Sequence, residues 1–347
     1  MSGRINCLRF CETQPAAIFR PRSADGVSTF VRTIRAFALS GQAPFAIFGV
    51  GQQPALGSRP LGLSVAGGRS ARNGIGGLAL QGGLSLFSSR EAFIADNIVL
   101  APGNIVDANA KDHPDLWRIL RGGGNNFGVV TRFDLRTFKQ GPLHGGSIYC
   151  FPPSFPSEIQ ALVTELQKPN ATPETHLMIS VGFAAVYYTQ AVDKPEVSEL
   201  FTSTQPQIDQ LNALRLTPNV TEAANEQAGD QQLAKRAAYM NATVKADIAT
   251  LRAAADIYTA VMDPVESTEG LICSLTLQPY AEPLLQRSAA KGGDVLGPKH
   301  KLGGDDAILG AMKTALQGID QDATFKGTKV DYVYMNYASE GQDIIGL

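Results

Sequence analysis

The chain has 347 residues, of which 44% are hydrophobic and 18% charged, and its net charge is −2. This length allows two ordinary domains or one large one. The composition supports a sizeable buried core, so disorder is not the default expectation. The small net charge, without a long run of one sign, argues against binding to nucleic acid or to an anionic membrane surface. No stretch is apolar enough to span a bilayer.

Residues 15–51 read as a strand, a helix and a second strand, followed by a glycine turn. Short apolar runs at 17–19 and 45–48 predict the strands, and Ser23 can cap the helix between them. The apolar positions of that helix follow the i, i+3, i+4, i+7 rule: Val27, Phe30, Val31 and Ile34. Short strands that alternate with a helix predict an α/β or α+β domain.

A second glycine-dense stretch, GGRSARNGIGGLALQGG, covers residues 67–83. We expect no regular helix or strand here, because each glycine loses extra backbone entropy on folding. The gain from such a composition is either a turn with positive φ or a close approach of the backbone to a ligand.

The next segment has the clearest local signals. Asp112 and Pro114 fit the start of a helix that ends near Gly122, and the alternation over residues 129–136 predicts a strand. Between them lies the third glycine loop, Gly-Gly-Gly-Asn-Asn-Phe-Gly. Trp117 is interpreted as a packing residue. Arg121 and Arg132 are interpreted as solvated side chains, with pairing to phosphate as the alternative.

The composition changes around residues 140–146, and a domain boundary is placed there. Beyond it we predict a helix at 159–166, strands at 177–183 and 271–277, a helix-rich middle at 222–262, a helix at 307–316 and a strand at 330–337. The four cysteines and four histidines have no metal-binding spacing, so we expect no metal and buried structural thiols. The N-terminus lacks the apolar core of a secretion signal, yet Asn170, Asn219 and Asn241 begin glycosylation motifs, so the compartment stays open.

Three glycine-rich loops in one domain suit a phosphate-bearing cofactor, although they also fit ordinary turns. The first loop is not a dinucleotide fingerprint, which disfavours a nicotinamide dehydrogenase. Two longer stretches are more specific: GIGGLALQGGLSLFSSREAFIADNI at 74–98 and ANAKDHPDLWRILRGGGNNFGVVTRFDLRTF at 108–138. With residues 15–51 and the terminal Tyr334-Met335-Asn336-Tyr337, they resemble the berberine bridge enzyme-like oxidoreductases.

This resemblance implies an α+β fold in three parts. Residues 1–140 would form a PCMH-type FAD-binding domain that lacks some segments. Residues 141–328 would form a substrate domain, in which helices cover an antiparallel sheet. Residues 329–347 would return to the FAD domain as a strand. The implied reaction is hydride removal from a small organic, secondary-metabolite substrate, with FAD as cofactor and molecular oxygen reoxidising the flavin.

The family's functional positions carry over to particular residues. Asn336 matches a residue near the flavin, and Tyr337 matches a position that serves some members as base, although it also fits a strand-end aromatic. A phenol acts as a base only where positive charge or hydrogen bonds stabilise the phenolate. The matches to backbone cofactor contacts are Gly49, Gly51, Gly76, Gly77, Gly82 and Gly83.

The chain also departs from the family pattern. Gln52 occupies the position of the histidine that usually bonds to the flavin, and Ser70 lies near the position of a second, cysteinyl link. FAD is therefore expected to be held non-covalently. Compared with the family pattern, strands are also skipped near residues 54–60, after Ile98 and at 297–305, and the family's C-terminal helix and tail are missing. A shortened gene product, faulty exon assignment or a non-catalytic remnant would each explain these gaps, since missing strands leave edges unpaired.

Overall fold

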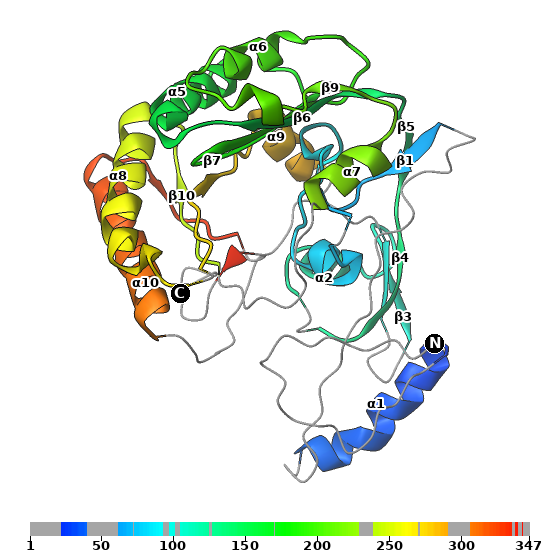
Figure 1. Ribbon diagram of the computed structural model, residues 1–347. Helices are drawn as coiled ribbons and strands as arrows, with labels where there is room; N and C mark the ends of the chain where they lie inside the picture. Colours follow the sequence, from blue (N-terminus) through cyan, green and yellow to red (C-terminus); the bar gives the residue numbers. More distant parts are fainter. Residues whose placement is uncertain are drawn as a thin grey trace.

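The computed structural model in Figure 1 describes residues 22–39, 62–71, 73–92, 97–100, 105–124, 127–169, 171–228, 239–269, 271–290, 306–334, 337–338 and 342. The strands expected at 17–19 and 45–48 lie outside these residues. So do four of the expected cofactor contacts, namely Gly49, Gly51, Gln52 and Asn336.

The helix expected after Ser23 is confirmed as α1 (Ala24–Leu39). The Ser23 hydroxyl accepts a hydrogen bond of 3.1 Å from the backbone N–H of Gly26, one of the donors that the first turn leaves free. In Figure 1, α1 lies at the edge of the molecule, at the far end from the large sheet.

The second glycine stretch does form a helix, which corrects the expectation from its composition. It folds as α2 (Ile75–Leu80), between β1 (Leu63–Val65) and α3 (Ser88–Glu91). Ala79 and Leu80 of α2 are buried and pack in one cluster with Leu120. This burial offsets the backbone entropy that the helical glycines lose on folding.

A three-stranded antiparallel sheet of order β3-β2-β4 lies beside this helix. Its strands are β2 (Asn97–Leu100), β3 (Val106–Ala108) and β4 (Val130–Asp134), and α4 (Pro114–Leu120) packs on it. The predicted helix and strand of this segment are thus confirmed, and so is Trp117 as a packing residue. Arg121 is not solvated: it is 7% exposed, and its guanidinium lies 3.9 Å from the centre of the Trp117 ring.

The third glycine loop holds α2 and α4 together. The backbone N–H groups of Gly122 and Gly124 both donate to the Leu80 carbonyl, at 2.9 and 3.0 Å. A Cβ atom on Gly123 would lie 2.5 Å from the Ile119 carbonyl oxygen. This loop therefore requires glycine for packing within the protein, whatever it does toward a cofactor.

The second half of the chain is built on a five-stranded antiparallel sheet of order β11-β7-β8-β6-β9. The strands are β6 (Leu143–Tyr149), β7 (Thr175–Ser180), β8 (Phe183–Tyr188), β9 (Arg215–Thr217) and β11 (Thr276–Leu277). The helices are α5 (Phe155–Leu166), α6 (Glu196–Thr202), α7 (Val220–Ala228), α8 (Ile248–Glu266), α9 (Glu282–Ala290) and α10 (Asp306–Phe325), with 3₁₀ turns at Pro152–Ser154 and Asp209–Leu211.

The two faces of this sheet have different partners. Leu177 and Ile179 of β7 belong to a core shared with α5, α6 and α8. On the other face, Ala185 and Tyr187 of β8 pack with Phe87 from the first half of the chain and with α7. Figure 1 shows α5 and α6 over the outer side of the sheet. The sheet's inner face therefore meets the glycine-rich half of the chain.

Arg90 helps to join the two halves. Its guanidinium lies 5.0 and 4.9 Å from the centres of the Phe87 and Phe138 rings, and it pairs with Glu174 at 3.2 Å. Phe138 belongs to β5 (Thr137–Lys139), which pairs with β1. The cation thus connects the first-half strands with the loop that precedes β7.

Three predicted strands are shorter than expected. The alternation over 177–183 spans the hairpin between β7 and β8, where Gly182 has a φ of +83°. Only Thr276–Leu277 pairs within 271–277, and Cys273 is exposed instead of buried. The terminal strand is β12 (Lys329–Val330), which pairs with β10 (Thr243–Val244), so Tyr337 does not lie in a strand.

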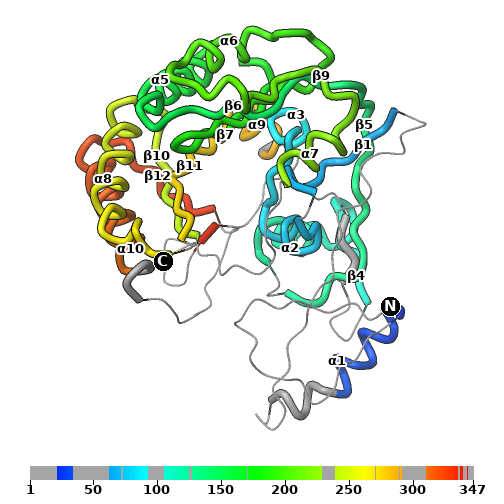
Figure 2. Tube along the Cα trace, viewed as in Figure 1, coloured from blue at the N-terminus to red at the C-terminus, as the bar shows by residue number. Residues whose placement is uncertain are grey.

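The helices α8 and α10 lie side by side, as Figure 2 shows, and they bring the end of the chain back toward the sheet. Gly318 of α10 permits this close approach, because a Cβ atom there would lie 2.9 Å from the Ile257 side chain. None of the described helices is long and apolar enough to cross a membrane.

Candidate functional site

A cluster of tyrosines gathers where the end of the chain meets the glycine-rich half. The rings of Tyr334 and Tyr337 meet edge to face at 5.1 Å and 89°, and Tyr239 stacks on Tyr337 at 5.2 Å and 22°. Tyr280 contacts both Tyr332 and Tyr334 edge to face. Five tyrosines from three separate segments thus surround one point.

Hydrogen bonds fix the backbone of this cluster. The Leu84 N–H donates to the phenolic oxygen of Tyr334 at 3.3 Å. The side chain of Asn241 holds the backbone of Tyr334 from both sides, accepting from its N–H at 2.8 Å and donating to its carbonyl at 3.0 Å. The Asn241 motif therefore has a structural role that its sequence pattern did not reveal.

Arg69 brings the second glycine stretch to the same point. Its Nη2 donates a hydrogen bond of 2.6 Å to the phenolic oxygen of Tyr337, and its Nη1 lies 3.4 Å from Sδ of Met178 on β7. Arg69 is half-buried. The glycine stretch, the five-stranded sheet and the end of the chain therefore converge on one guanidinium.

Two titratable groups that the charge of Arg69 affects, His176 and Tyr280, are held in their neutral forms. Burial, and secondarily the charge of Arg69, lowers the pKa of His176 to about 3, so this imidazole is uncharged at neutral pH. Burial raises the pKa of the Tyr280 phenol, and the neighbouring Tyr332 and Tyr334 raise it further. Tyr280 is therefore a poor candidate for a base.

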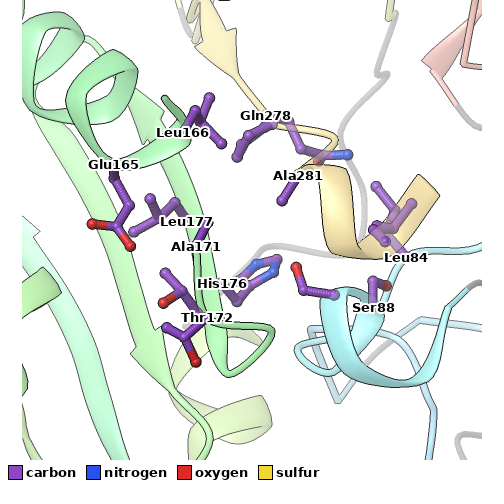
Figure 3. Close-up of a pocket in the computed structure, with 14 residues that line it drawn as sticks. Leu84, Ser88, Glu165, Leu166, Ala171, Thr172, His176, Leu177, Gln278 and Ala281 are labelled. Atoms are coloured by element: carbon purple, nitrogen blue, oxygen red, sulfur yellow. The ribbon is translucent and has the colours of Figure 1, made fainter. Parts of the chain in front are cut away.

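A small cavity of about 30 Å³ is lined by His176, as Figure 3 shows. Residues of β7, α3 and the segment before α9 line it, among them Thr175, Ser88 and Gln278. Thr175 is 9% exposed, and neither its hydroxyl nor Oε1 of Gln278 has a hydrogen-bond partner. The cavity has room for one or two water molecules and is too small for an organic substrate.

The predicted glycine contacts fall into two groups. A Cβ atom on Gly76 or Gly77 would meet no heavy atom within 4 Å, so open space borders the start of α2. Gly82 has a φ of +65°, and a Cβ on Gly83 would lie 2.5 Å from the Leu78 carbonyl oxygen. The first pair thus borders open space, whereas Gly82 and Gly83 are needed by the chain's own backbone.

Of the predicted site residues, Tyr337 and the second glycine stretch lie in one region. The contributions of Arg69, Tyr239 and Tyr280 were missed. Arg69 lies inside the glycine stretch that the sequence singled out, yet no spacing signal connects it with a residue so far along the chain. Among the described residues, no group of histidine, cysteine and carboxylate side chains could hold a metal ion.

No protein-family profile matches the chain, but individual proteins do. The FAD-dependent monooxygenase FUP4 of Fusarium proliferatum is 32% identical over 321 residues, which is 81% of this chain and 62% of that protein. The FAD-dependent monooxygenase tpcD of Cochliobolus heterostrophus is 31% identical over 322 residues, again 81% of this chain and 62% of that protein. The chain thus spans less than two thirds of the length of these relatives.

Solved structures share the fold. The 6-hydroxy-D-nicotine oxidase of Arthrobacter nicotinovorans superimposes with a TM-score of 0.59 and 16% identity, covering 82% of this chain and 67% of that chain. The BBE-like 1 protein of Physcomitrella patens superimposes with a TM-score of 0.59 and 15% identity, covering 92% of this chain and 82% of that chain. The expected α+β fold is confirmed by these likenesses.

Proposed function

Because the chain belongs to the FAD-linked oxidoreductases of the berberine bridge enzyme-like family, we propose that it binds FAD and removes a hydride from a small organic substrate. FAD supplies the two-electron acceptor when bound, and molecular oxygen would take those electrons with release of peroxide. The substrate is proposed to be a secondary metabolite. The observation that carries this proposal is the meeting of Arg69, Tyr337 and the second glycine stretch.

The open space at Gly76 and Gly77 supports a cofactor at the start of α2. A backbone without side chains can approach pyrophosphate oxygens closely, and a Cβ atom at either position would intrude on that approach. Gly82 and Gly83 would shape the loop behind the cofactor. Gly49, Gly51, Gln52 and Asn336 are proposed to complete its binding.

We assign to Tyr337 the role of general base. Its phenolate oxygen would accept a proton from the substrate as the hydride leaves the adjacent carbon. Arg69 places a fixed positive charge 2.6 Å from that oxygen, where negative charge must exist for the phenol to act as a base. Stacking of Tyr239 and edge contact with Tyr334 would hold the Tyr337 ring in position.

Non-covalent attachment is proposed because the Gln52 amide cannot form a histidyl–flavin bond. Ser70 likewise offers no thiol near the second linkage position. The rival function is a remnant that no longer holds FAD. Gln52 and the gaps in the family pattern near residues 54–60, after Ile98 and at 297–305 are the observations in its favour.

An absorption spectrum of the purified protein, before and after acid precipitation, separates these two functions. We expect a flavin spectrum that moves entirely to the supernatant, as a non-covalent cofactor must. Flavin that stays with the pellet would contradict non-covalent binding. A colourless protein that remains colourless after FAD is added would contradict the proposed function and identify the chain as a remnant.

A further inference from the structure

Arg69 carries a partly buried positive charge that no carboxylate balances within the described residues. Its two contacts are a phenolic oxygen and a thioether sulfur, and none of the described ion pairs includes it. Moving a guanidinium partly out of water is costly unless an anion pairs with it. Since a guanidinium has five N–H donors, further donors remain for another partner.

Among the described residues, no carboxylate, lysine or second arginine is recorded in contact with Arg69. His176 on β7 is neutral, because burial and Arg69 itself lower its pKa to about 3. Met178 on the same strand contributes a thioether sulfur, and Tyr337 from the end of the chain contributes a phenolic oxygen. The charge of Arg69 lowers the pKa of Tyr280 slightly, but burial raises that pKa more and keeps the phenol protonated. Within the part of the chain that the structure describes, Arg69 is thus the cation that acts on both His176 and Tyr280.

An exposed aromatic ring lies on the other side of Tyr337. Tyr239 is 56% exposed, although it stacks on Tyr337 at 5.2 Å and 22°. Tyr337 is itself held edge to face by Tyr334 at 5.1 Å. An ordered aromatic ring with much of its surface in solvent offers a stacking surface for another flat ring.

We propose that Arg69 and Tyr239 form a subsite for a planar aromatic substrate that carries an acidic oxygen, either a carboxylate or an ionised phenol. The acidic oxygen pairs with the free donors of Arg69, and the ring stacks against Tyr239. The substrate is thereby held beside the Tyr337 oxygen. This subsite rests on the proposed function and narrows its substrate class.

FAD itself also has a flat ring and anionic groups, so the experiment must distinguish the cofactor from a substrate. The probe is 2-naphthoate, compared with its neutral analogue 2-naphthamide and with the non-aromatic cyclohexanecarboxylate. Calorimetric titration of each probe is carried out on the protein with FAD and without it. Flavin retention is measured separately for every variant.

We expect 2-naphthoate to bind more tightly than both comparison probes. Arg69→Met should weaken its binding 10- to 100-fold and change 2-naphthamide binding less than 3-fold, because a charge-assisted hydrogen bond is lost. Arg69→Lys should give an intermediate loss. Tyr239→Leu should weaken the binding of both aromatic probes, 2-naphthoate and 2-naphthamide. Arg132→Met is the matched control, since it removes an exposed arginine that pairs with Asp134 away from this cluster.

Equal binding of the three probes, or an equal loss for Arg69→Met and Arg132→Met, would overturn the subsite. So would an Arg69→Met protein that releases FAD but binds 2-naphthoate normally, because Arg69 would then belong to the cofactor. If the parent never retains FAD, the proposed function fails, and the titrations without FAD still decide the subsite. Melting curves identify a variant that fails to fold. If Arg69→Met fails to fold, the binding of 2-naphthoate by the charge-retaining Arg69→Lys decides whether the subsite exists.

Discussion

Nη2 of Arg69 lies 2.6 Å from the phenolic oxygen of Tyr337, although the two residues are 268 positions apart in the chain. This hydrogen bond connects the second glycine stretch with the last described turn. Because its donor is charged, it is stronger than a bond between neutral groups. The position of the proposed base is therefore set by the opposite end of the sequence.

Gly77→Ala should have opposite effects on folding and on cofactor binding. Alanine favours a helix by about 0.5–1 kcal/mol over glycine, and a Cβ here meets no protein atom within 4 Å, so the flavin-free protein should melt at a higher temperature. The same methyl group would occupy the space proposed for FAD and weaken its retention. Gly310→Ala in α10 is the matched control, since its Cβ also meets nothing. Unchanged FAD affinity in Gly77→Ala would argue against a cofactor at the start of α2.

Tyr337→Phe should retain FAD and lose turnover. Removal of the general base is expected to slow flavin reduction by about 10²–10⁴-fold, measured anaerobically with a substrate found by screening for peroxide release. Tyr149→Phe is the control, because this tyrosine ends β6 and packs on Phe183, and it has no recorded contact with the tyrosine cluster among the described residues. If the flavin of Tyr337→Phe were reduced as fast as that of the parent, Tyr337 would not be the general base.

Glu158→Gln should alter how stability depends on pH. Glu158 is fully buried, and burial raises its pKa above the usual value of 4.5. The folded protein therefore keeps the proton to higher pH than the unfolded chain does. The parent's free energy of unfolding should fall as pH rises above that usual value, by up to about 1.4 kcal/mol per pH unit. Glutamine does not ionise in this range. The free energy of unfolding of the variant, measured by urea unfolding, should therefore rise relative to that of the parent as the pH increases above 4.5.

Glu196→Gln provides a contrast of opposite sign. Glu196 is exposed, and its contact with Lys168 lowers its pKa. Any stability from that pair is present above the usual pKa of glutamate and is lost as pH falls. If the stability of both variants relative to the parent changed with pH in the same direction, the raised pKa of Glu158 would be contradicted.

Thr175→Val tests whether the cavity beside His176 holds ordered water. A dry cavity would leave the Thr175 hydroxyl unpaired, and valine would then stabilise the protein by about 1–3 kcal/mol. We expect the reverse, a loss of about 1 kcal/mol, because the cavity has room for a water molecule and Gln278 offers it a second partner. Thr217→Val is the control: its buried hydroxyl also has no partner, yet Thr217 does not line the cavity. If both variants had a higher free energy of unfolding than the parent, the cavity would be dry.

The sequence alone determined the elements whose signals are local. The cap at Ser23, the proline start at Pro114 and the apolar spacing of residues 159–166 each predicted a helix that the structure confirms. Residue patterns along short stretches also carried the family resemblance and the FAD cofactor that the family implies. Such features depend on neighbours within a few turns of the chain, so the order of residues is sufficient to specify them.

Tertiary structure decided what depends on distant partners. Burial of Ala79 and Leu80 made a helix of a glycine stretch, and a turn at Gly182 divided one apparent strand into a hairpin. Only the folded chain brings Arg69 to Tyr337 and leaves its charge without a carboxylate among the described residues. The physical reason is that burial, pairing and electrostatic potential arise from residues that packing brings together, and their separation along the chain contains no information about that packing.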